Sequence, residues 1–384
     1  MSTIETLPSQ SSVSQLYAAD APEAWLLAQY PSSNSTDTIF QNRTKFQIHD
    51  PFPPPPKQLL QELGPHHLMC AWGKSTVVTS QTEPDPRLLQ HWANVVGDDS
   101  VPDWKPFDAQ QNFITLFPHE SLPAERQLVP PDINYRLHSK EIIETIDFPQ
   151  AKVLDQVVPP CVVKLSHGYA GLGNFFIRNA FDDSMMREQV AQQWPDATLV
   201  INELLENIVG DTGIQFYLRK DGSVVWLGLT QQQFNEKARW SGGVFSYDEQ
   251  EEGRQRYEAA VLATARCLSS HGYFGVVGID ILTDADGQQF LVDVNPRLTG
   301  VTPFLMASRR FVTQGATEGI YLASQNFAGS LAALFQATES ITDASVLVLS
   351  ACENVEDQTT ICHLSVSSTS QADNQQILRR LIQA

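Results

Sequence analysis

The chain has 384 residues, of which 42% are hydrophobic and 18% are charged. This composition excludes a globally disordered protein, and the length predicts two or three domains. Aspartate and glutamate number 44 against 25 lysines and arginines, which gives a net charge of −19. A surface this acidic repels phosphate backbones and anionic lipid, so we expect neither nucleic acid nor a membrane as a partner.

Several features of the sequence predict a cytoplasmic protein. No run of about 18 apolar residues is present that would cross a membrane. The first residues show no basic segment followed by an apolar one, so we expect no secretory signal. The five cysteines are well separated and odd in number, which is typical of reduced thiols rather than of a disulfide framework.

Residues 1–130 are predicted to form an N-terminal α/β domain. Residues 76–80 are an apolar run typical of a buried strand, and residues 85–97 have helical periodicity with a proline near the start and a glycine near the end. A strand followed by a helix favours an α/β arrangement. A proline-containing stretch at 127–140 indicates that this domain ends near residue 130.

Residues 131–326 are predicted to form the main domain, of the α+β class. The Asp-Gly pair within residues 213–229 is typical of a hairpin turn, and an apolar stripe behind an acidic start predicts one helix over 249–270. Residues 327–384 contain two strand-like runs that we expect to complete or cap this domain. The other predicted strands are 161–165, 174–179, 198–206, 274–282 and 288–295.

A loop with three glycines follows a lysine at the end of the first of these strands, in the sequence KLSHGYAGLGN from Lys164 to Asn174. Glycines allow successive backbone N–H groups to point at a phosphate, and the lysine adds a positive charge. The loop lacks the terminal GK[ST] of a P-loop, and it joins two strands, unlike the Rossmann fingerprint. Taken alone, it fits a phosphate-binding loop and an ordinary turn equally well.

Three oxygen-bearing side chains are predicted to share one face of a hairpin. Asp293 and Asn295 are two residues apart on one strand, and Asp280 lies on the strand before it. Mg²⁺ prefers such oxygen ligands, and two adjacent buried carboxylates without a cation would be costly. These residues therefore indicate a magnesium site, and the alternative is a strand edge that faces water. Arg297 follows directly and could pair with a carboxylate or a phosphate.

Residues 235–247 combine two positive charges with two adjacent glycines in an otherwise acidic chain. We interpret them as a loop that faces the substrate, in which Arg239 contacts a carboxylate or a phosphate; an ordinary surface loop is an equally supported alternative. No Ser-His-Asp or Cys-His arrangement has a local signature, so catalysis by a side-chain nucleophile is unsupported.

The glycine-containing loop after VVK, the segment INELL and the hairpin GIDIL…LVDVNPRLTG, in this order, resemble the ATP-grasp superfamily, and in particular its carboxylate–amine ligases. The resemblance covers about residues 135–310, and the spacing from the first aspartate to the NPR sequence is its most specific part. It implies an ATP-grasp fold, in which two α+β subdomains enclose ATP and the lid subdomain occupies about residues 140–205.

The same resemblance implies which residues contact the nucleotide. Lys164 and the earlier Lys140 would reach the phosphates of ATP, and the loop 166–173 would close over them as a lid. A histidine at position 167 is unusual for the family, and we expect His167 to be exposed. The other residues implied to contact ATP are Ser166, Gly168, Gly171, Gly173, Glu203, Leu204, Leu205 and Asp211.

For the metal and the reaction, the resemblance implies that Asp280, Asp293 and Asn295 hold Mg²⁺, with Mn²⁺ as a substitute. Asp293 stands where a glutamate is usual, which leaves open whether one or two ions bind. Arg297, with Arg239, would stabilise the reacting acyl group.

The function predicted in this way is that of an ATP- and Mg²⁺-dependent ligase. A small-molecule carboxylate would attack the γ-phosphate to give an acyl phosphate, and an amine would then displace phosphate to give an amide. The expected partners are these two small molecules, and the family resemblance also allows a homodimer. Two alternatives stay open: transfer to another acceptor, such as bicarbonate, a thiol or an alcohol, and a nucleotide-binding module without turnover.

Overall fold

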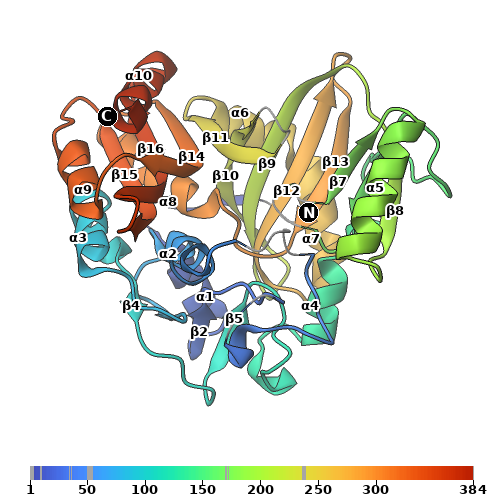
Figure 1. Ribbon diagram of the computed structural model, residues 1–384, viewed down its shortest axis with the longest axis horizontal. Coiled ribbons are helices and arrows are strands. Elements are labelled where there is room, and N and C mark those ends of the chain that lie inside the picture. Colours follow the sequence, from blue (N-terminus) through green and yellow to red (C-terminus); the bar gives the residue numbers. More distant parts are fainter. Residues whose placement is uncertain are drawn as a thin grey trace.

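The computed structural model describes residues 4–8, 11–33, 35, 37–49, 55–168, 171, 173–235 and 239–383. Three β-sheets organise this part of the chain (Figure 1). In that view the N-terminal sheet lies at the bottom, the small sheet with α5 at the right, and the C-terminal strands with α10 at the upper left. No helix within these ranges is both long enough and apolar enough to cross a membrane.

The N-terminal sheet is parallel, in the order β4-β3-β2-β5, as predicted for an α/β region. Helix α3 (Pro86–Val95) begins where the Asp85 side chain accepts a hydrogen bond from the Arg87 N–H, and it buries Leu88 and Trp92. The other elements of this region are β2 (Ala24–Leu27), β3 (Val77–Thr79), β4 (Asp103–Trp104), β5 (Asn112–Thr115), α1 (Val13–Asp20), α2 (Gly64–Met69) and α4 (Pro131–Leu137). Short helical turns are η1 (Thr38–Phe40), η2 (Leu59–Leu63), η3 (Asp98–Ser100), η4 (Ala124–Arg126) and η5 (Lys140–Thr145).

The large sheet follows the order β13-β12-β9-β10-β11-β14-β16-β15, and every pairing along this path is antiparallel. A further strand, β1 (Ile4–Thr6), pairs in parallel with β10. Alternation along β9 and β12 places Ile214 and Ile279 in a core shared with helix α7, so the opposite face is free to carry polar groups. The elements are β9 (Ile208–Leu218), β10 (Val224–Phe234), β11 (Trp240–Ser246), β12 (Gly275–Asp284), β13 (Gln289–Asn295), β14 (Glu318–Phe327), β15 (Ser345–Asn354) and β16 (Thr359–Ser368).

The small sheet is antiparallel, in the order β7-β6-β8, and helix α5 (Ala180–Gln193) covers one of its faces. The helix begins where the Asn179 side chain accepts hydrogen bonds from two backbone N–H groups, and it buries Met186 and Val190 against the sheet. Lys164 alternates with the residues of this core and therefore projects from the other face. The strands are β6 (Cys161–Leu165), β7 (Asn174–Ile177) and β8 (Leu199–Glu203).

The C-terminal residues extend the large sheet and pack on the N-terminal region. Strands β15 and β16 follow β14 in the sheet, and the indole N–H of Trp92 on α3 donates a hydrogen bond to the carbonyl of Val348 on β15 (2.9 Å). The boundary predicted at residue 326 lies one residue before the end of β14. The remaining helices are α8 (Thr302–Thr313), α9 (Leu331–Glu339) and α10 (Gln371–Gln383).

Two predictions about the main domain are wrong in detail. The helix expected over 249–270 is two helices, α6 (Glu249–Arg256) and α7 (Glu258–Ser270), because Tyr257 leaves helical geometry to bury its ring and to place its hydroxyl 3.1 Å from that of Thr212. Most of the loop expected over 235–247 is strand β11, because Gly242 (φ +151°) packs directly against the carbonyl of Tyr321 on β14. Residues 236–238 of that segment lie outside the described residues.

Candidate functional site

Strand β13 carries a β-bulge at the predicted metal site. Asp280 pairs with Asp293 across β12 and β13, but the next residue of β12 pairs with Leu291, so Val292 is an extra residue on β13. Because of this insertion, Leu291 and Val294 both lie in the core, while Asp293 shares the opposite face with Asp280. Without it, Asp293 would follow the alternation of Leu291 into the core.

Two lysines from different elements reach β13 at this point. The ammonium group of Lys140, on η5, forms an ion pair and a hydrogen bond with Oδ1 of Asp293. The ammonium group of Lys164, on β6, donates a hydrogen bond to the Val292 carbonyl, which the bulge exposes (2.8 Å). The structure therefore brings both predicted phosphate-binding lysines to the predicted metal ligands.

The two aspartates differ in their electrostatics. Burial raises the pKa of Asp280 well above its ordinary value, and the charges of Asp293 and Asp211 raise it further. Burial also acts to raise the pKa of Asp293, but Lys140, followed by Lys164 and Arg297, outweighs burial and lowers it. Burial and the neighbouring Lys140 lower the pKa of Lys164 to about 8. Negative charge on Asp280 is therefore disfavoured in this site unless a cation is bound.

This donor set fits Mg²⁺. Mg²⁺ in proteins is commonly held by one or two carboxylates and completed by water and substrate phosphates, and the carboxylates of Asp280 and Asp293 share one face with Asn295. Within the described ranges, no three His, Cys, Asp or Glu side chains form a metal-binding group of their own, so phosphate or water oxygens would have to complete the shell. Asp293 accepts hydrogen bonds from Lys140 and from the Val294 N–H at Oδ1, so a cation bound to this oxygen would compete with Lys140.

Arg297 is connected to the same group of residues. One of its terminal nitrogens donates a hydrogen bond to Oδ1 of Asn295 (2.7 Å), and the amide nitrogen of Asn295 lies 3.3 Å from Oδ2 of Asp293. Arg297 is only 7% exposed. Arg239 differs, because it is exposed at the turn between β10 and β11, where its N–H donates a hydrogen bond to the side chain of Asn235 (3.1 Å).

Asp211 lies on the same sheet face as the aspartate pair. It pairs with Leu282 on β12, two residues beyond Asp280, and residues two apart on a strand project to the same side. Burial raises the pKa of Asp211 to about 6, and its Oδ1 makes no hydrogen bond within the described part of the chain. The contact with ATP that the resemblance implies for Asp211 would therefore involve a carboxyl group that is poorly solvated.

The start of the glycine-containing loop is packed rather than exposed. His167 stacks on Tyr135 with ring centres 3.8 Å apart, and its Nε2 donates a hydrogen bond to the Tyr135 carbonyl (3.0 Å). The expectation that His167 is exposed is wrong, because this aromatic partner comes from α4, far away in the sequence. Ser166 and Gly168 are buried beside it, whereas Gly171 and Gly173 are partly exposed with φ of +73° and +94°. Residues 169, 170 and 172 lie outside the described residues.

A narrow pocket lies between the small sheet and β13, and Asn202 at its lining precedes three residues that the resemblance implies contact ATP. These three residues are Glu203, Leu204 and Leu205, and the Glu203 side chain accepts a hydrogen bond from the Lys152 N–H (2.9 Å). The space inside the pocket that a water-sized group can occupy is only about 10 Å³, far below the roughly 300–1,000 Å³ of typical ligand sites, so a nucleotide would require the small sheet to move outward. The pocket is lined by Lys140, Lys164, Val200, Asn202, Leu291 and Val292, among others.

Comparison with known proteins agrees with this geometry. Residues 139–295 match the family described as "L-aspartate--L-methionine ligase, ATP grasp", and this span contains the lysines, the loop and the three predicted metal ligands. The chain has the ATP-grasp fold. The predicted resemblance to the ATP-grasp superfamily and its ligases is therefore confirmed.

Individual relatives of this ATP-grasp chain are distant. The [butirosin acyl-carrier protein]--L-glutamate ligase of Niallia circulans is 21% identical over 259 residues, which span 58% of this chain and 61% of that relative. An N5-carboxyaminoimidazole ribonucleotide synthetase bound to ADP superposes with a TM-score of 0.51 and 11% identity, over 82% of this chain and 93% of that one. The corresponding synthetase of Staphylococcus aureus, also with ADP, gives 0.50 and 12%, over 80% and 90%. These two likenesses show the fold alone.

Some residues of the ATP-grasp site were not predicted from the sequence. Val200 and Asn202 line the pocket. The alternation of β8 could have identified them, because both flank Ile201, which packs in the core of the small sheet, and so project from its other face. Val292 could not be predicted, because a bulge within an apolar run leaves no trace in the pattern.

Proposed function

We propose that the protein is an ATP-dependent ligase that activates a small-molecule carboxylate as an acyl phosphate and joins it to an amine. The observation that carries this proposal is the pair Asp280–Asp293 on one sheet face, contacted by Lys140 and adjoined by Lys164 at a narrow pocket. The matching family and the curated relative are both named as ligases, which supports the same reaction type.

In the first step, different residues of this chain would bind the phosphates and the metal ion. Lys140 and Lys164 would hold the phosphate oxygens of ATP, and Lys140 would leave Asp293 to do so. Mg²⁺ held by Asp280, Asp293 and Asn295 would supply charge neutralisation at these oxygens. The substrate carboxylate oxygen bonds to the γ-phosphorus as the bond to ADP breaks, which gives the acyl phosphate and ADP.

In the second step the amine nitrogen bonds to the acyl carbon, loses a proton, and inorganic phosphate leaves with the electron pair. The buried guanidinium of Arg297 would offset the negative charge that develops on the acyl oxygen. A closed cleft between the small sheet and β13 would exclude the water that otherwise hydrolyses the acyl phosphate.

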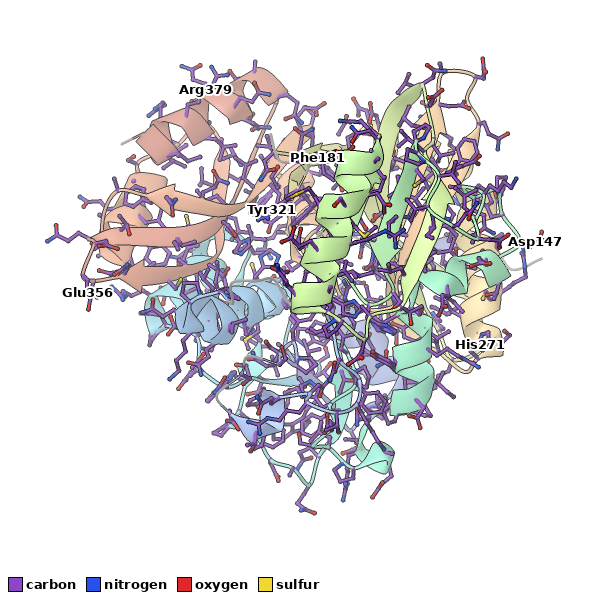
Figure 2. All side chains as sticks on the ribbon, turned by 45° about the vertical axis from the view of Figure 1, so that its right-hand side comes forward. Asp147, Phe181, His271, Tyr321, Glu356 and Arg379 are labelled. Atoms are coloured by element: carbon purple, nitrogen blue, oxygen red, sulfur yellow. The ribbon has the colours of Figure 1, made fainter. Side chains whose placement is uncertain are left out.

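We place the amine substrate at the uncharged end of the same sheet face. Strand pairing continues this face from Asp280 through Gly213 to β10, where Phe234 pairs with Trp240. It then reaches Tyr321 of β14, which is labelled in Figure 2. Phe234 and Trp240 are at least partly exposed, Tyr321 is buried beneath Trp240, and none of these residues is charged. An aromatic surface favours an amine with an apolar side chain, which agrees with methionine in the name of the matching family.

We also place the reaction in the cytoplasm, where thiols stay reduced. All five cysteines are unpaired, and four of them are buried.

An ADP-release assay with pairs of amino acids and small carboxylates, with mass detection of products, tests the proposal. Release should require Mg²⁺ and an acid, and the product mass should equal acid plus amine minus water. Asp293→Ala and Asn295→Ala should abolish release without unfolding the protein, while Asp286→Ala, in the exposed turn of the same hairpin, should not. Full activity of Asp293→Ala would refute the metal assignment. Binding of MgATP without ADP formation over the whole panel would indicate a nucleotide-binding module instead.

A further inference from the structure

Two neighbouring aromatic rings from the N-terminal region lie against the guanidinium of Arg297 and help to enclose it. Its central carbon lies 5.0 Å from the ring centre of Phe117 and 5.9 Å from that of Tyr30, and the two rings are themselves 5.9 Å apart. These distances are within the range of cation–π contacts, which are strongest where water is excluded. Phe117 is buried, and so is Arg297.

The N–H groups of this guanidinium are only partly hydrogen-bonded within the described residues. One terminal nitrogen is bonded to Asn295, but Nε is buried and makes no hydrogen bond within the described chain. No carboxylate among the described residues lies within ion-pairing distance of Arg297. A buried cation that has aromatic faces and an unsatisfied N–H edge is prepared for an anion that arrives with the substrate.

The topology explains how the two rings reach this point. Tyr30 follows the end of β2 and Phe117 follows the end of β5, and these strands are parallel neighbours in the N-terminal sheet. The carboxyl ends of parallel strands meet at one sheet edge, which is where α/β sheets generally place binding groups. Tyr30 is anchored further, since its hydroxyl donates a hydrogen bond to the Leu298 carbonyl, next to Arg297 (3.3 Å).

Phe117 also connects Arg297 to the segment that carries Lys140. Its ring centre lies 4.1 Å from that of His138, whose Nδ1 donates a hydrogen bond to the Asn134 carbonyl (2.8 Å). Lys140 comes two residues later and pairs with Asp293. Phe117 thus contacts Arg297 directly and, through His138, the segment that carries Lys140.

We propose that Tyr30 and Phe117 are positioning residues, which hold the plane of the Arg297 guanidinium so that its Nε–H edge meets the acyl phosphate. The N-terminal region is then part of the site that handles the activated acid, and its parallel sheet supplies the contacts. The part of this inference that concerns the acyl phosphate rests on the proposed ligase function; the enclosure of Arg297 does not.

The enclosure is tested by solvent exchange of the Arg297 Nε–H in protein with ¹⁵N-labelled arginine, with Arg297→Lys used to identify its resonance. In the wild type this proton should exchange slowly. Phe117→Leu and Tyr30→Leu should each accelerate exchange about tenfold or more, because they open a face of the guanidinium. Phe117→Tyr should restore slow exchange, and unchanged exchange in both leucine variants would overturn the proposal.

The catalytic consequence is tested by ADP release with a matched control. Phe117→Leu should lower kcat about tenfold while KM for ATP stays within about twofold, and in an Arg297→Lys background it should have no further effect. Phe113→Leu removes a buried ring of β5 that stacks on Phe107, so it should lower Tm without changing kcat below the unfolding range. An equal loss of kcat in Phe117→Leu and Phe113→Leu would overturn the positioning role. If the wild type releases no ADP with any acid, the proposed function fails, and the exchange experiment still decides the enclosure of Arg297.

Discussion

Asp280 and Asp293 face each other across two strands, yet their surroundings shift their pKa values in opposite directions. Asp293 has Lys140 as a partner, whereas Asp280 has burial and two neighbouring carboxylates, Asp293 and Asp211. Asp280 is therefore destabilising in the protein without a bound cation, as is typical of residues retained for function. The same residue type on one sheet face is stabilised as an anion at position 293 and disfavoured as an anion at position 280.

Isosteric substitutions should separate the two aspartates. Asp280→Asn removes a carboxyl group whose charged form is disfavoured by burial and should raise the free energy of unfolding by about 1 kcal/mol, while abolishing Mg²⁺-dependent nucleotide binding. Asp293→Asn leaves the ammonium group of Lys140, only 8% exposed, without its partner and should lower that free energy by about 1–2 kcal/mol. Urea unfolding and calorimetric titration with MgADP measure both effects. Shifts of the same sign in the two variants would contradict this account of the charges.

At the scale of the elements, the sequence predicted those whose pattern is local. The hairpin of β12 and β13 was predicted because its turn and its acids are close in sequence, and the Asp284 side chain does cap that turn by accepting from the Asp286 N–H (3.0 Å). The bulge at Val292 was not predicted, because residues 290–292 are all apolar and the sequence therefore does not show which of them face the core. The burial of His167 depends on Tyr135, a partner that no local pattern reveals.

The seam between β11 and β14 depends on one glycine. Gly242 has φ of +151°, and a Cβ there would lie 1.9 Å from the Tyr321 carbonyl oxygen, so backbone would have to move. Gly242→Ala should lower the free energy of unfolding by more than about 2 kcal/mol. Gly287→Ala is the matched control, because Gly287 also has a positive φ but has open space around it, and it should cost about 1 kcal/mol. Thermal and urea unfolding compare the two, and equal losses would show that packing at this seam is unimportant.

At the scale of the whole molecule, buried histidines lie where the N-terminal region meets the rest of the chain. His91 on α3 accepts a hydrogen bond from the Val348 N–H of β15 (2.9 Å), and His67 on α2 donates one to the Gly300 carbonyl (2.6 Å). Burial lowers the pKa of each of these two histidines to about 4, so both are neutral in the folded protein near pH 7. Burial lowers the pKa to about 4 in His49, His66, His119 and His167 as well.

These histidines predict how stability depends on pH. Each has a pKa near 6.5 when unfolded and about 4 when folded, so between these values the unfolded chain binds more protons. Stability is therefore fully present above about pH 6.5 and is lost as the pH falls toward 4, by about 1 kcal/mol for each histidine between pH 7.5 and 5.5. His91→Gln keeps an acceptor for the Val348 N–H but cannot bind a proton, so its loss of stability over this interval should be about 1 kcal/mol smaller than that of the wild type. Urea unfolding at both pH values measures the difference, with Gln90→Ala on the exposed face of the same helix as the control. An unchanged pH dependence in His91→Gln would mean that this histidine is not held neutral by the contact between α3 and β15.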